Sequence, residues 1–97
     1  MPRERKEVEA ALEKKGFLRN EGDHHRFIFH TKDGRKTRVL TKTSHSHRQI
    51  ADNILSQMAK QCGLSNKQFG LLVDCPLSRE DYELELISAG LISPQAS

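Results

Sequence analysis

The chain has 97 residues, of which 35% are hydrophobic and 30% are charged. This length fits one domain with a modest core, and the composition is that of a globular protein rather than a disordered one. No apolar run approaches the roughly 20 residues that a bilayer-spanning helix needs, and the start Met-Pro-Arg-Glu-Arg-Lys lacks the apolar stretch of a secretory signal. We therefore expect a single cytoplasmic domain.

The charge is divided unevenly along the chain. Residues 1–48 hold thirteen Lys and Arg against seven Asp and Glu, a net charge of +6, whereas residues 49–97 hold three against six, a net charge of −3. Such a division can attract a polyanion to one face of the molecule. The alternative is an ordinary solvated surface of mixed charge.

The two cysteines predict reduced thiols. Cys62 and Cys75 form no CxxC pair, and a chain of this kind has too few cysteines for a disulfide framework.

The pattern of the first half of the chain predicts a helix followed by three strands. Val8, Ala11 and Leu12 have helical spacing within residues 3–15, and Gly16 is a typical residue to follow a helix. Short extended segments are expected over residues 17–22, 25–31 and 36–43. Asp33-Gly34 predicts a two-residue type I′ hairpin turn, which places Phe27 opposite Leu40. Because each face of that hairpin carries apolar residues, the alternation leaves open which face meets the helices.

Three helix-start signals follow in the second half. A capping box at residues 46–49 predicts a helix with Ile50, Ile54, Met58 and Cys62 on one stripe, ending at Gly63. Similar signals at Ser65 and Ser78 predict two further short helices. The order α-β-β-β-α is that of double-stranded-RNA-binding domains, and it predicts an α+β fold with helices on one face of a three-stranded antiparallel sheet. We expect one domain, divided into a core over residues 3–64, a helical extension over 65–91 and a tail over 92–97.

All five histidines fall between residues 24 and 47, among six Lys and Arg residues, and Arg48 follows directly. The ordinary pKa of histidine, about 6.5, allows it to exchange a proton near neutrality. RNA supplies its own nucleophile in the 2′-OH, so one histidine can remove that proton while cations stabilise the charge on the phosphate. Arg26, Lys36, Arg38 and Lys42 are the candidate RNA contacts. For His30 and His47 the simpler interpretation is a solvated side chain.

Four short motifs follow one another along the chain. They are Lys15-Gly16-Phe17, then Gly22-Asp23-His24-His25-Arg26-Phe27, then Ser44-His45, and finally Ala59-Lys60-Gln61-Cys62-Gly63-Leu64. Taken together, these motifs resemble those of the HicA (YcfA-like) toxins. The likeness covers residues 8–64. The helical extension after Leu64 lies outside the usual pattern of that family.

The resemblance implies a double-stranded-RNA-binding type of fold and ribosome-independent cleavage of mRNA. It assigns the catalytic role to His24 and makes His45 a candidate substrate-facing residue by position. His25 is a common neighbour in the motif and is either accessory or structural. The resemblance also implies a HicB-type antitoxin as the protein partner. The resulting hypothesis is an endoribonuclease that uses neither a metal nor another cofactor, as a monomer or a homo-oligomer.

Three alternatives remain at this point. A binding module of the same fold needs only contacts to phosphates and 2′-OH groups. A metal site could use the clustered histidines, although the sequence contains no CxxC and no helical HxxxH pattern. The acidic C-terminal helices, or a second subunit, could also cover the basic face.

Overall fold

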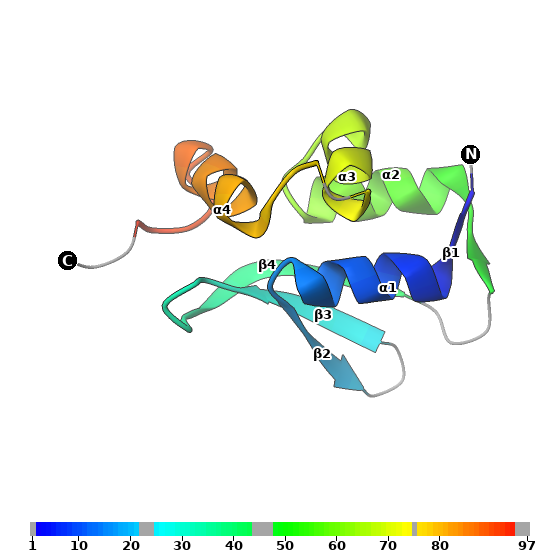
Figure 1. Ribbon diagram of the computed structural model, residues 1–97, viewed down its shortest axis with the longest axis horizontal. Coiled ribbons are helices and arrows are strands. Elements are labelled where there is room, and N and C mark those ends of the chain that lie inside the picture. Colours follow the sequence, from blue (N-terminus) through cyan, green and yellow to red (C-terminus); the bar gives the residue numbers. More distant parts are fainter. Residues whose placement is uncertain (1, 22–24, 44–47, 75, 95–97) are drawn as a thin grey trace.

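The computed structural model describes residues 2–21, 25–43, 48–74 and 76–94. The main sheet has three antiparallel strands in the order β2-β3-β4, with bounds Phe17–Glu21, His25–His30 and Lys36–Thr43. Four helices accompany it, α1 (Arg5–Lys14), α2 (Asp52–Gln61), α3 (Asn66–Val73) and α4 (Arg79–Ser88). The α+β fold and the α-β-β-β-α order of a double-stranded-RNA-binding domain are confirmed, with two further helices after them (Figure 1).

The side chains of the sheet divide cleanly between two faces. Phe17, Phe27, Phe29, Val39 and Thr41 are buried, and they form the inner face that packs against the helices. The residues between them point outward and leave the other face uncovered, which we call the outer face. It carries Leu18, Asn20, Arg26, Ile28, His30, Lys36, Arg38, Leu40 and Lys42.

The hairpin register differs from the expected one by one residue. Phe27 pairs with Thr41 and Ile28 with Leu40, and a bulge follows before His30 pairs with Lys36. The loop and the bulge together set this register. In the loop, the amide of Gly34 donates to the carbonyl of Thr31 and Gly34 takes a φ of 89°, which makes a three-residue loop with a left-handed glycine rather than a two-residue turn. The loop alone would bring Phe27 opposite Val39, and the bulge moves the pairing on to Thr41. The shift turns Val39 inward and Leu40 outward.

The helix after the sheet begins later than the capping signal at residues 46–49 predicts. Gln49–Ile50 is a short strand, β5, that pairs with β1 at Arg3–Glu4, and α2 starts only at Asp52 with Ala51 as its N-cap. The pairing joins two segments far apart in the sequence, so local start signals could not predict it. The predicted helix start at Ser65 is confirmed as a complete capping box with Gln68, and Ser78 likewise caps α4.

The two C-terminal helices complete the core. Tyr82 is fully buried, and its ring lies 5.8 Å from that of Phe17 and 5.0 Å from that of Phe29. Its hydroxyl donates a 2.7 Å hydrogen bond to the carbonyl of Cys62. Lys15 donates to the carbonyl of Leu77, before α4. Further along, Ile92 packs against the same core.

Arg79 also joins α4 to the sheet. Its guanidinium donates to the carbonyls of His30 and Thr31, at the end of β3. Gly16 has a φ of 103°, which favours glycine, and a Cβ there would also come within 2.6 Å of the Arg79 side chain and 2.9 Å of the Phe29 ring. Cys62 is a free thiol in this core, and burial raises its pKa to about 12. Cys75 lies outside the described residues.

The position of Tyr82 predicts that the extension contributes to stability. Tyr82→Ala should lower the free energy of unfolding by about 3–5 kcal/mol, because a large aromatic side chain leaves a cavity. Leu84→Ala on the same helix is the control, since Leu84 is 62% exposed and its truncation should change stability by less than about 0.5 kcal/mol. Urea unfolding followed by circular dichroism measures both; equal losses would contradict the packing described here.

Candidate nucleic-acid interface and the Glu9 cluster

The four predicted RNA contacts lie together on the outer face. Arg26 is on β3, and Lys36, Arg38 and Lys42 are on β4. All four are exposed. No described side chain on this face is acidic. The structure therefore brings together residues that the sequence predicted separately.

Two of these cations are direct neighbours across the strands. Arg26 pairs with Lys42, and Asn20 completes the row on β2. Like charges at directly opposed positions of an antiparallel pair are destabilising. A bound polyanion would relieve this repulsion, which distinguishes the row from an ordinary solvated surface of mixed charge.

The acidic C-terminal helices do not cover this face. The core residues Tyr82 and Leu86 place α4 against the inner face, and Figure 1 shows α2, α3 and α4 on one side of the sheet. Glu83 reaches the hairpin loop instead, where its carboxylate accepts from the amide of Lys32. The alternative in which these helices shield the basic face does not hold for the described residues, because Arg26, Lys36, Arg38 and Lys42 are all exposed.

The buried carboxylate of Glu9, on α1, accepts hydrogen bonds from the start of β3 and from the end of β4. Glu9 is 3% exposed, and its Oε2 atom accepts hydrogen bonds from Nδ1 of His25 at 2.8 Å and from the hydroxyl of Thr43 at 2.5 Å. Arg19 on β2 donates to its Oε1 atom at 3.4 Å, and the Arg5 guanidinium lies 3.9 Å from Oε2. We call these five residues the Glu9 cluster.

The cluster keeps the carboxylate ionised. Burial alone would raise the pKa of Glu9, but hydrogen bonds from Thr43 and His25, and the charges of His25 and Arg19, more than offset it and lower the pKa below its ordinary value. A buried charge is tolerated only when it is paired and hydrogen-bonded in this way. Arg19 is in turn held by Glu13 and by the ring of Phe27, 5.3 Å away.

Through its hydrogen bonds Glu9 links His25 and Thr43, which are the strand residues next in sequence to the remaining candidate residues. His25 is the first residue of β3 and follows His24 in the sequence, and Thr43 is the last residue of β4 and precedes Ser44-His45. His24, His45 and His47 themselves lie outside the described residues. His25 points inward to Glu9, with its side chain 13% exposed.

Sequence reasoning missed Glu9 and Thr43. Glu9 stands next to Val8, beside the apolar stripe of α1, where a charged residue is ordinarily solvated. Only the sheet packed over the helix distinguishes it from Glu7 or Glu13. Within the described ranges, no group of three His, Cys, Asp or Glu side chains could hold a metal ion, and no helix is long and apolar enough to cross a membrane.

The comparisons with known proteins define the class of this chain. Residues 5–64 match the model of a family described as the HicA toxin of bacterial toxin–antitoxin systems. The match covers α1, the whole sheet and α2. No curated protein and no solved structure matches the chain.

The protein is thus a toxin of the toxin–antitoxin class. It belongs to the HicA toxin family, as the motifs around Gly22 and Leu64 predict, and membership in this family implies an antitoxin as its partner.

The Glu9 cluster generates a prediction about pH. Glu9→Gln should destabilise the fold by about 1–3 kcal/mol at pH 7, because the strong acceptor of two buried hydrogen bonds becomes a neutral one. The folded-state pKa of Glu9 lies below its unfolded value, so its contribution is full above the unfolded pKa and is lost as the pH falls through the folded pKa. The difference between wild type and variant should therefore shrink in acid.

Glu13→Gln is the matched control. Glu13 lies one turn further along α1, pairs with the same Arg19 at 2.7 Å, and is 45% exposed. Its substitution should cost less than about 1 kcal/mol. Urea unfolding of the three proteins between pH 3 and pH 7 tests both statements; a Glu9→Gln penalty that is constant with pH would refute the paired, ionised carboxylate.

Proposed function

We propose that this protein is an RNA-cleaving toxin whose outer sheet face binds the RNA backbone and whose catalytic residue is His24. The observation that carries the proposal is the like-charged pair Arg26 and Lys42 on an uncovered face without a described acidic side chain. Family membership supports the toxin role, and the Gly22-Asp23-His24 motif supports the choice of histidine. Such a toxin would act on cytoplasmic mRNA and be held inactive by a HicB-type antitoxin.

The chemistry follows from the substrate. His24 acts as general base on the 2′-OH, or as general acid on the leaving group. The 2′ oxygen attacks the adjacent phosphorus, the bond from phosphorus to the 5′ oxygen breaks, and a proton passes to that leaving oxygen. The products are a 2′,3′-cyclic phosphate and a 5′-OH end. Lys and Arg side chains stabilise the charge that develops on the phosphate.

His25 has a supporting role in this proposal. Its Nδ1 proton is directed at Glu9, so one ring nitrogen is committed to the cluster. We infer that the pair orients the chain at the start of β3, next to His24 in the sequence, and that His25 is a positioning residue. His45 remains a candidate for a substrate-facing role.

The assignment of the catalytic role to His24 gives one prediction about this function. His24→Ala should abolish RNA cleavage and growth arrest on expression, because the proton acceptor is lost. His30→Ala is the matched control. His30 stands on the outer face at the opposite end of β3, with its Nδ1 bonded to the backbone carbonyl of Ile28, so its loss should leave cleavage at saturating RNA intact even if it weakens binding. Cleavage is measured on a 5′-labelled RNA, with the cyclic phosphate identified by mass spectrometry. Cleavage by the His24→Ala protein would refute the assignment.

A binding module without nuclease activity gives a different pattern. The wild type would then bind the RNA but leave it intact, and His24→Ala would leave its cellular effect unchanged. Thermal unfolding of each variant separates loss of activity from loss of fold.

The assignment of RNA binding to the outer face gives a separate prediction. The double variant Arg26→Gln, Lys42→Gln should weaken RNA binding and reduce the slope of log affinity against log salt by about 1.4, because two phosphate contacts to a single strand are lost. The double variant Lys60→Gln, Lys67→Gln, which removes two exposed cations from the helices, should leave the slope unchanged. Fluorescence anisotropy over a salt series measures both, and equal slopes for the two double variants would exclude the outer face as the binding surface.

A further inference from the structure

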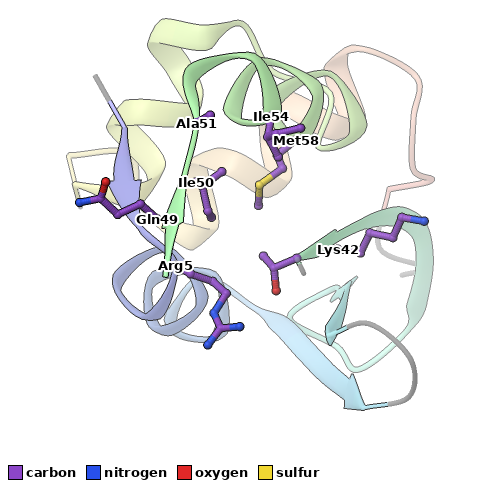
Figure 2. A pocket seen from close by; sticks show the side chains of 8 residues that line it. Arg5, Lys42, Gln49, Ile50, Ala51, Ile54 and Met58 are labelled. Atoms are coloured by element: carbon purple, nitrogen blue, oxygen red, sulfur yellow. The ribbon is translucent and has the colours of Figure 1, made fainter. Parts of the chain in front are cut away.

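A pocket of about 390 Å³ lies between α1, the end of β4, β5 and α2. Its lining consists of Arg5, Lys42, Thr43, Gln49, Ile50, Ala51, Ile54 and Met58 (Figure 2). Neither the motifs nor the proposed chemistry assigns it a role. It is also distinct from the predicted phosphate contacts, since only Lys42 belongs to both.

The pocket combines an apolar floor with two cations at its edges, of which Arg5 is paired with the buried Glu9 and Lys42 is exposed. Met58 and Ile50 are buried, and Ile54 is 40% exposed. Figure 2 shows these three side chains together, whereas the charged ends of Arg5 and Lys42 point away from them at separate edges. The described lining contains no acidic residue. These features suit a flat, largely apolar group that is attached to an anion.

We propose that this pocket binds one unpaired nucleobase of the RNA substrate, with the adjoining phosphate next to Lys42. This inference rests on the proposed function and specifies part of its substrate site. Proteins that read single-stranded RNA hold splayed-out bases against flat side chains, mostly aromatic ones, while cations follow the backbone. The described lining of this pocket has no aromatic side chain, so the base would lie against Ile50, Ile54 and Met58 instead. A base pocket of this kind would determine which nucleotide is held beside the cleavage site.

The pocket is continuous with both parts of the proposed site. Lys42 lines it and also stands opposite Arg26 on the outer face, so RNA bound to that face can reach the pocket over the end of β4. Thr43 lines it too, and the Thr43 hydroxyl donates to Glu9, which accepts from His25. A base in the pocket would therefore lie next to the Glu9 cluster.

Ile54 lines the pocket and is partly exposed, so it can be substituted without disturbing the buried core. Ile54→Ser should lower the affinity for a short unstructured oligoribonucleotide about tenfold, because a base loses its apolar contact. The matched control is Leu71→Ser on α3, where the leucine is 38% exposed and lies outside the pocket lining. Binding is measured by fluorescence anisotropy in the His24→Ala background, so that the oligoribonucleotide stays intact.

A second measurement locates the base directly. Titration of the wild type with each of the four nucleoside 3′-monophosphates should shift the backbone amide resonances of Ile50, Ala51 and Ile54. Inorganic phosphate should leave these three resonances unchanged. Equal shifts with phosphate alone would overturn the base pocket.

The outcomes separate the pocket from the nuclease. If the Ile54→Ser protein binds the oligoribonucleotide as the control does, the pocket assignment is wrong, while cleavage by the wild type would still support the proposed function. If binding depends on Ile54 but the wild type does not cleave, the pocket is supported and the nuclease fails. If Ile54→Ser weakens only the complex with the antitoxin, the pocket serves a protein partner and the inference is overturned.

Discussion

The ionised carboxylate of Glu9 is the constraint on which the arrangement of the site depends. A buried carboxylate costs several kcal/mol unless its oxygens are hydrogen-bonded and its charge is paired. Here the partners come from β2, β3 and β4, and from α1 itself. The helix can lie on the sheet only where all of them reach Glu9. This requirement fixes the ends of β3 and β4 relative to α1.

One consequence is that the inner face of the sheet holds the helix, whereas the outer face carries the cations. The inner side chains at the ends of β3 and β4, His25 and Thr43, are used to satisfy Glu9. Their sequence neighbours Arg26 and Lys42 point the other way, because successive side chains of a strand alternate. The contacts that hold the helix therefore leave the adjacent cations on the outer face, where their like charges repel each other.

The sequence predicts those features that depend on local pattern. Helical spacing, the caps at Ser65 and Ser78 and the strand propensities suffice for the element order. They do not place the four cations on the outer face, because both faces of the hairpin carry apolar residues. The register does not follow from the Asp33-Gly34 pair either, because a three-residue loop and a two-residue turn both accept that pair and the bulge beyond the loop changes the pairing again. Glu9 and β5 were missed for a related reason. Their partners are distant in the sequence, so nothing nearby distinguishes Glu9 from an exposed glutamate.

The extension beyond Leu64 stabilises the sheet from its inner face. The family match ends at Leu64, yet the aromatic pair Phe17 and Phe29 is completed by Tyr82 from α4. Arg79 contacts backbone carbonyls at the end of β3 that is remote from the Glu9 cluster. The acidic half of the chain thus stabilises the sheet from its inner face. The segment after α4 reaches the edge of the outer face, where Leu91 and Ser93 line a pocket with Lys36 and Arg38. The helices themselves lie on the inner side, so the basic row of Arg26 and Lys42 stays exposed.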